Sequence, residues 1–331
     1  MNKVNVKSFF ERNGSWIFAA VGCVVLWVLM GVAGNGLSFQ SLINNAYTAA
    51  FLGIAGLAQM LVVSTGRGAI DLSIPGMITL GAYLGMGIMN GKNSMIIPAF
   101  LVIIAVGCVV GILNSMMVAY LKIPAIIATM AMNYIIVTGT MLIDHSFNVF
   151  TIPSIMSTIV KFRIAGIPVI IFFVIALTFL INYLLTSTTY GKSLLSLGQN
   201  LEAARLAGVR VVKVQMITYV ISSVFSGISG ALLSARNTGA YLGMGDNYQM
   251  DSIACIVIGG TLMSGGRANA AGTLVGSLFL YMVISAMQLL GANAGMQNAV
   301  KGALIVIVLL IGASDKKLSR EVKYKKNAPA K

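Results

Sequence analysis

Residues 13–66 read NGSWIFAAVGCVVLWVLMGVAGNGLSFQSLINNAYTAAFLGIAGLAQMLVVSTG, a run of 54 residues without one Asp, Glu, Lys or Arg. A helix that crosses the hydrocarbon core of a bilayer needs about 20 such residues. The run therefore predicts two membrane spans joined by a short turn. Because no small-residue cleavage site follows the first apolar stretch, we expect this stretch to be a retained span and not a signal peptide.

The rest of the chain shares this character. Of its 331 residues, 58% are hydrophobic and 9% are charged, whereas a soluble domain has about 25% charged residues. We therefore predict an all-α polytopic membrane protein with about ten transmembrane helices. The eighth apolar segment is short enough to be a half-helix. The predicted spans are 16–36, 43–65, 72–90, 95–121, 124–143, 167–186, 213–235, 252–264, 269–290 and 296–313.

The basic residues predict an orientation. If the N-terminus is cytoplasmic, 17 Lys and Arg residues fall on the cytoplasmic side and 4 on the other, with Lys301 inside the last span. This asymmetry follows the positive-inside rule. The net charge of +14 then indicates contact with anionic lipid headgroups and no nucleic-acid partner. We expect both termini to be cytoplasmic, with an N-terminal segment 1–15, a transmembrane domain 16–313 and a basic tail 314–331.

A polar segment, residues 187–212, interrupts the apolar runs and falls on the cytoplasmic side. Its sequence EAARLAG, residues 202–208, predicts a short helix that Asn200 caps and a left-handed glycine ends. Two polar side chains and two small alanines on such a helix suit docking into a groove of another protein. An ordinary solvated loop helix is the alternative. The predicted contact residues are Glu202, Ala203, Ala204, Arg205 and Gly208.

Several amides lie within or near the predicted spans. Unpaired amides are costly in hydrocarbon, so we expect them to face the bundle interior. They either line a polar path or hold helices together, and the residues leave both roles open. These amides are Asn44, Asn45, Gln59, Asn114 and Asn133.

Motifs for catalysis, cofactor binding and ion coupling are missing. Gly191-Lys192-Ser193 matches the end of a phosphate loop, but Thr186 replaces the glycine that the loop requires, so we expect no ATP binding by this chain. The only histidine, His145, lies in a predicted loop, and no enzyme or metal site is expected.

All eight acidic residues fall at span ends or in loops. An ion-coupled carrier usually keeps ionisable groups at mid-membrane, so we expect another polypeptide to supply the driving force.

The polar segment, with EAA-x-x-x-G spacing, resembles the coupling loop of the membrane subunits of ATP-binding-cassette (ABC) importers. More narrowly, the chain resembles the permease subunit of ribose-type monosaccharide importers over about residues 45–315. One departure from that family is Gly66-Arg67-Gly68-Ala69, where a plainer Gly-Gly turn is usual. The supporting stretches are Ile70-Asp71-Leu72-Ser73, Ile126-Ile127-Ala128-Thr129, Tyr190-Gly191 with Gly198-Gln199-Asn200, and Ile258-Gly259-Gly260-Thr261 with Gly265-Gly266 and Gly272-Thr273.

The resemblance implies a permease of the bacterial inner membrane that moves a monosaccharide inward by alternating access. It implies a partner ATPase that binds ATP and magnesium, a solute-binding protein, and a second permease copy or paralogue. It also implies that Asp71 and Ser73 lie near the translocation path. Together with the amides, the predicted path residues are Asn45, Gln59, Asp71, Ser73, Asn114 and Asn133. The alternatives are an ion-coupled secondary carrier, a channel, and ABC permeases for nucleosides, autoinducer-type furanosyl signals or branched-chain amino acids.

Overall fold

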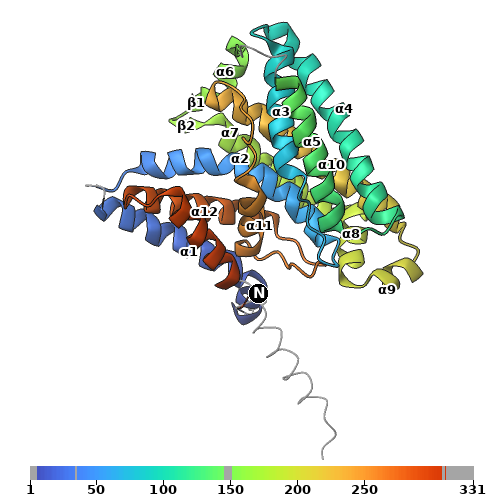
Figure 1. Ribbon diagram of the computed structural model, residues 1–331. Helices are drawn as coiled ribbons and strands as arrows, with labels where there is room; N and C mark the ends of the chain where they lie inside the picture. The colour runs from blue at the N-terminus through green and yellow to red at the C-terminus, as the bar shows by residue number, and fades with distance from the viewer. Residues whose placement is uncertain (1–5, 34–35, 145–150, 308–309, 311–331) are drawn as a thin grey trace, which may run out of the picture.

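The computed structural model describes residues 6–33, 36–144, 151–307 and 310, and it is almost entirely helical (Figure 1). A π-helical turn, Met116–Tyr120, extends α4, and two short strands, β1 (Arg163–Ile164) and β2 (Ile167–Pro168), form an antiparallel hairpin. The helices are α1 (Val6–Ala33), α2 (Phe39–Ser64), α3 (Ile74–Met89), α4 (Ile96–Ser115), α5 (Ala125–Asp144), α6 (Ser154–Lys161), α7 (Val169–Ser187), α8 (Thr189–Gln199), α9 (Leu201–Leu206), α10 (Val211–Asn237), α11 (Tyr248–Ile258), α12 (Ala270–Leu289) and a last helix, Ala294–Ile307.

The predicted number of membrane segments agrees with the structure. Within the described residues, seven helices are long and apolar enough to cross a bilayer, and α3, α11 and Ala294–Ile307 are shorter apolar helices. The chain is therefore a polytopic all-α membrane protein. The predicted basic tail 314–331 and His145 lie outside the described residues.

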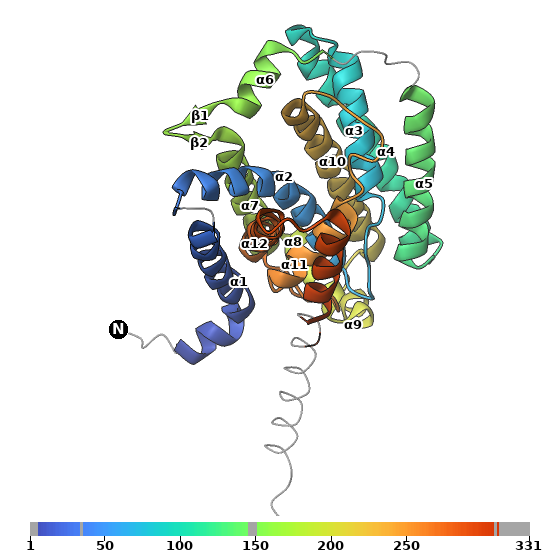
Figure 2. The ribbon, with the colours of Figure 1, turned by 60° about the vertical axis from the view of Figure 1, so that its left-hand side comes forward.

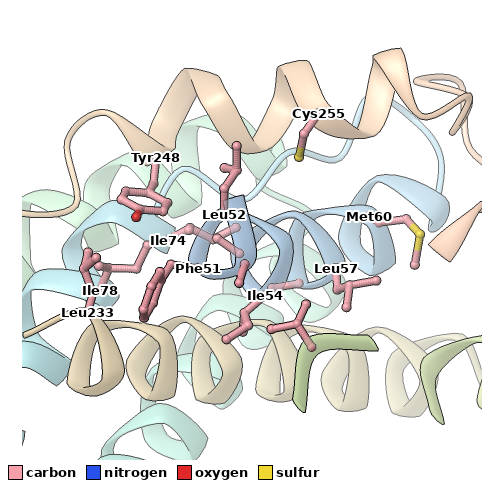
Figure 3. Packing of buried hydrophobic residues seen from close by; sticks show 14 of the residues in the cluster. Phe51, Leu52, Ile54, Leu57, Met60, Ile74, Ile78, Leu233, Tyr248 and Cys255 are labelled. Carbon is pink, nitrogen blue, oxygen red and sulfur yellow. The ribbon is translucent and has the colours of Figure 1, made fainter. Parts of the chain in front are cut away.

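Helix α2 is the centre of the bundle. In its most apolar window 83% of the residues are buried inside the protein, against 17% for α1. A helix that is apolar on all sides suits such an interior position. Figure 3 shows Phe51, Leu52 and Leu57 of α2 between α11 and α10. Figure 2 shows α1 and α5 at opposite edges of the bundle, where their apolar side chains remain exposed for contact with lipid.

Glycines allow α3, α4 and α10 to pack closely. A Cβ on Gly81 of α3 would overlap the carbonyl oxygen of Gly227, and one on Gly107 of α4 would lie 2.9 Å from Cα of Val224. Since the helices approach backbone to backbone, these small residues serve packing within one chain.

The bundle has two ends with different loops. At one end, which we call the α9 end, Arg67 lies beside Glu202 of α9. At the other, the α6 end, Gly91 donates a backbone hydrogen bond of 2.8 Å to Thr151, just before α6. Figure 1 shows α9 and α6 at opposite ends of the molecule. The loops that the charge pattern assigns to opposite sides of the membrane are thus separated.

Two non-helical linkers enter the bundle. Residues 65–73 join α2 to α3, and residues 259–269 join α11 to α12. The eighth segment, predicted at 252–264, is in fact α11, an 11-residue helix that ends at Ile258. It ends there because Gly259 and Gly260 follow, and Gly260 has a positive φ of 84°. The expectation of a short helix is confirmed, but its bounds are different.

The linkers change the interpretation of the acidic residues. Asp71 lies in the first linker and Asp251 in the first turn of α11, and their exposed fractions are 2% and 4%. Both positions are at a helix end in the sequence, yet both are inside the protein. Asp71 and Asp251 thus lie in a linker and at a helix start, as predicted, but they are buried there because interrupted helices place their ends within the bundle.

Candidate functional site

Helix α9 has the predicted caps. Asn200 Oδ1 accepts a 3.0 Å hydrogen bond from the backbone N–H of Ala203. Gly208 has φ of 82°, its N–H donates to Arg205 O, and the N–H of Val209 donates to Ala204 O, each at 3.0 Å. This pair of bonds is the Schellman ending of a helix. A six-residue helix, too short to be stable alone, is thereby fixed at both ends.

The predicted contact residues of α9 divide between two faces. Glu202, Ala203 and Arg205 are exposed, whereas Ala204 is only 4% exposed and faces the protein itself. An exposed ion pair of 3.7 Å joins Glu202 to Arg67 of the first linker, and such pairs add little stability. The face of α9 that is open to a partner therefore carries Glu202, Ala203 and Arg205.

Helix α8 attaches α9 to the bundle. The hydroxyl of Tyr190 lies 2.8 Å from that of Thr218 on α10. Burial raises the pKa of Tyr190 to about 12, so this side chain is neutral at physiological pH. Gly191 lies against the backbone of Leu184 and Leu185 at the end of α7. The polar segment is thus held by both α7 and α10.

A glycine junction links α8 to both linkers. We give this name to Gly66 of the first linker, Gly198 of α8, and Gly265 and Gly266 of the second linker. The N–H of Gly266 donates to Ser64 O at 3.1 Å. A Cβ on Gly66 would lie 2.9 Å from Gly198 O, and one on Gly198 would overlap both Ser64 O and Gly266 N. Only glycine permits this three-way contact of backbones.

The junction has a mechanical consequence. Close-packed backbone has low compressibility and transmits displacement. Gly198 lies three residues before Leu201, the first residue of α9, so the junction connects α9 to the linker before α3 and to the linker before α12. The first linker runs into the interior of the bundle, where Asp71 and Ser73 are buried, whereas Ser264 and Arg267 of the second linker are exposed.

The first linker ends in an interior polar cluster, which comprises Gln59, Asp71, Ser73, Asn114 and Ser222. Asp71 Oδ1 accepts hydrogen bonds from the N–H and the hydroxyl of Ser73, at 3.0 and 2.5 Å. Its Oδ2 accepts one of 2.7 Å from Ser222 of α10. The hydroxyl of Ser73 also accepts a 2.9 Å bond from Asn114 Nδ2 of α4.

Other side chains satisfy the linker backbone. With the Gln59 amide oriented to match its surroundings, its nitrogen donates to Asp71 O at 3.1 Å and its oxygen accepts from Asp71 N at 3.3 Å. Thr129 Oγ1 of α5 accepts from Leu72 N at 2.9 Å. Asn133 Oδ1 accepts from Gly76 N, in the first turn of α3, at 2.9 Å. Non-helical backbone at membrane depth needs such partners, because lipid offers none.

The structure thus brings together most of the predicted path residues. Gln59, Asp71, Ser73, Asn114 and Asn133 all surround the first linker and the start of α3. Asn45 does not join them. It lies on α2 toward the α6 end and accepts a 2.5 Å hydrogen bond from Ser285 of α12. It borders a polar cavity of about 510 Å³ between α1, α2 and α12.

Sequence reasoning missed part of the cluster. Ser222 is the main omission, and its neighbours Tyr219 and Ser223 each have a buried oxygen without a hydrogen-bond partner in the structure, as does Asn114 Oδ1. The sequence does indicate this polar face, because hydroxyl side chains recur at helical spacing along α10. They are Thr218, Ser222, Ser226 and Ser229. Such spacing marks one helical face. These interior atoms retain capacity to bind a polar solute.

Similar proteins identify the class of molecule. The ribose import permease protein RbsC of Escherichia coli (strain K12) is 26% identical, over 93% of this chain and 97% of RbsC. The galactose/methyl galactoside import permease protein MglC of Haemophilus influenzae is 27% identical, over 92% and 97% of the two chains. The probable ABC transporter permease protein YphD of E. coli is 27% identical, over 93% and 92%. No solved structure matches the chain.

A family described as "Branched-chain amino acid transport system / permease component" matches residues 41–309, which run from the first turn of α2 to beyond α12. The match also contains α9, the glycine junction and the interior polar cluster. The resemblance to sugar-importer permeases is confirmed by the named relatives. The chain belongs to the family of branched-chain amino acid transport system permease components.

Proposed function

We propose that this chain is the membrane-spanning subunit of an ATP-driven importer and moves a monosaccharide inward by alternating access. The observation that carries the proposal is α9, a capped helix with an open face. It follows directly on α8, whose Gly198 contacts the backbone of both linkers at the glycine junction. A partner ATPase that docks on this face holds the ATP and magnesium. The chain itself is a transport component and not an enzyme.

The geometry suggests how docking drives transport. Closure of the ATPase pair displaces α9, and the junction passes this displacement to the linkers before α3 and α12. Rigid-body movement of the helices that follow then opens the interior to one side of the membrane at a time. The interior polar cluster is closed to solvent in this structure, since Gln59, Ser73 and Asn114 have no exposed surface. The alternating movement of the helices exposes this cluster first to one side of the membrane and then to the other.

Two observations support a monosaccharide as the solute. The named relatives are import permeases for ribose and for galactose and methyl galactoside. In the interior polar cluster, the acidic group is Asp71, and Ser73 and Ser222 already donate hydrogen bonds to its oxygens. The remaining groups are amides and hydroxyls, which suit a neutral, hydroxyl-rich solute better than a zwitterion. The family description favours a branched-chain amino acid as the second candidate.

The proposed assembly follows from this role. It contains a second copy of the chain or a paralogue, two cytoplasmic ATPases and a solute-binding protein on the opposite side. The chain lies in a bacterial inner membrane, with the α9 end and both termini in the cytoplasm.

Uptake of labelled ribose and galactose, each with and without competing leucine, distinguishes the two solute classes.

Bulky or charge-reversing substitutions on α9 are expected to uncouple the importer while the bundle stays folded. Ala203→Trp fills the open face, Glu202→Lys reverses a charge there, and Gly208→Val disfavours the left-handed ending. Each change is expected to cost about 1–3 kcal/mol of docking. That corresponds to an ATPase affinity about 5- to 150-fold weaker. Co-purification with the ATPase and solute uptake measure the effect.

The control for bulk is Ala294→Trp, at an exposed alanine of the α6 end. It is expected to retain uptake, and all variants are expected to keep the melting temperature of the parent in detergent. Normal uptake in the three α9 variants would refute docking on this helix. Loss of uptake in the Ala294→Trp variant as well would show that a bulky side chain disrupts the protein regardless of its position.

The orientation is tested with single cysteines in a background that lacks Cys23, Cys108 and Cys255. A cysteine at Asn247, an exposed residue in the loop before α11, is expected to react with an impermeant thiol reagent in intact cells. One at Leu206 of α9, which is 89% exposed, is expected to react only after permeabilisation. Labelling of the Leu206 cysteine in intact cells would place α9 outside and remove the basis for ATPase docking.

A further inference from the structure

A basic groove lies beside the turn that follows α9. It is a cavity of about 510 Å³ between the start of α8, the turn after α9 and the start of α10. Its walls carry two cations, Arg210 and Lys213, and the hydroxyls of Thr189 and Ser193 on one face of α8. Val214 and Ile217 of α10 form its apolar part. We use the name basic groove for this set of residues.

The polar half of the groove offers donors that no described side chain uses. Arg210 and Lys213 are exposed, and neither is in an ion pair with an acidic residue of the described chain. A guanidinium and an ammonium beside two hydroxyls are the groups that bind a phosphate oxygen. The nearby Glu202 pairs with Arg67 instead. The chemistry of this half therefore favours a phosphate-bearing anion.

The apolar half favours a lipid over a free phosphate. Arg210, Lys213, Val214 and Ile217 follow the spacing of a single face of α10, so the two cations come first and the apolar side chains lie further into the membrane span. Val214 is 7% exposed. A ligand with a charged head and a hydrocarbon chain matches this order. Basic pockets at the cytoplasmic ends of spanning helices are suited to acidic lipid headgroups.

We propose that the basic groove is a binding site for one anionic phospholipid. Its phosphate contacts Arg210 and Lys213, and its acyl chain lies along Val214 and Ile217. The inference rests on the proposed function only for its orientation, which places the α9 end at the cytoplasmic leaflet. Because Ala207 and Gly208 form part of the groove wall, the lipid contacts the turn between α9 and α10.

The test is native mass spectrometry of the full chain, purified in detergent without its ATPase and titrated with phosphatidylglycerol or phosphatidylcholine of the same acyl chains. Phosphatidylglycerol is expected to bind with the higher affinity. The double variant Arg210→Gln, Lys213→Gln is expected to bind it about 10- to 30-fold more weakly, from the loss of two cations at a membrane surface. Neither residue belongs to the proposed docking face.

The matched control is Lys122→Gln, Lys192→Gln, which removes two cations that do not line the groove. It is expected to bind phosphatidylglycerol like the parent, which excludes a general effect of net charge. Equal binding of both lipids, or equal weakening by both double variants, would overturn the proposal. Displacement of phosphatidylglycerol by millimolar glycerol 3-phosphate would overturn it in favour of a soluble phosphate ester. Since the ATPase is absent, this result is independent of the α9 docking test.

Discussion

The Gly198→Ala variant is expected to lose nearly all uptake. Its added methyl group would overlap Ser64 O, at the end of α2, and Gly266 N of the second linker, and both are backbone atoms. Backbone cannot rotate away as a flexible side chain can, so the cost is expected at the upper end of overpacking, about 3 kcal/mol. If this cost raises the free energy of the junction arrangement that transport requires, solute uptake declines about 100-fold. Solute uptake and the melting temperature in detergent measure the two consequences.

The control is Gly139→Ala on α5, where an added Cβ meets no atom within 4 Å. This variant is expected to retain uptake and to gain up to about 1 kcal/mol of helix stability. A second junction variant, Gly265→Ala, is expected to behave like Gly198→Ala, because its Cβ would overlap Gly66 and its φ is 83°. Full uptake in both junction variants would contradict the role of the glycine junction in coupling.

The second large effect is expected at a buried ion pair. Lys301 Nζ, on the last helix, lies 2.8 Å from Asp251 Oδ1 on α11, and their side chains are 9% and 6% exposed. Asp251→Asn leaves the ammonium without a counter-charge in the interior, which typically destabilises a protein by about 3–5 kcal/mol. The melting temperature is expected to fall strongly. Lys301→Met is expected to do the same by leaving the carboxylate unpaired.

The double variant Asp251→Asn, Lys301→Met is expected to recover most of the lost stability. Replacing both members of a buried pair with neutral groups is often close to neutral, because the desolvation cost disappears together with the attraction. The three melting temperatures form a double-mutant cycle. Additive losses in the double variant would show that the two residues do not form the pair that attaches α11 to the last helix.

Local features of the site are predictable from the sequence. The ends of α9 follow from Asn200 and Gly208, since a cap needs only residues a few positions apart. The expectation that Gln59, Asn114 and Asn133 face the interior follows from the cost of an unpaired amide in lipid. The inward position of Ala204 is not predictable in this way, because it depends on which face of α9 meets the bundle.

The long-range features are not predictable from one sequence. Asp251 and Lys301 are 50 residues apart, and Asp251 reads as a loop residue until α11 is known to start inside the bundle. The glycines at 66, 198 and 265 lie in the first linker, in α8 and in the second linker, far apart in the sequence, and only the fold makes them one junction. For the same reason Ser222 is recognised as a partner of Asp71 only once α10 lies beside the first linker.

The central claim is that a separate ATPase drives uptake through this chain. The most direct measurement uses right-side-out membrane vesicles that contain the chain and its solute-binding protein, with or without the ATPase. We expect uptake of labelled solute only when both the ATPase and internal ATP are present, with no loss when an ionophore dissipates the ion gradients. Uptake that requires a proton or sodium gradient and proceeds without the ATPase would contradict the account.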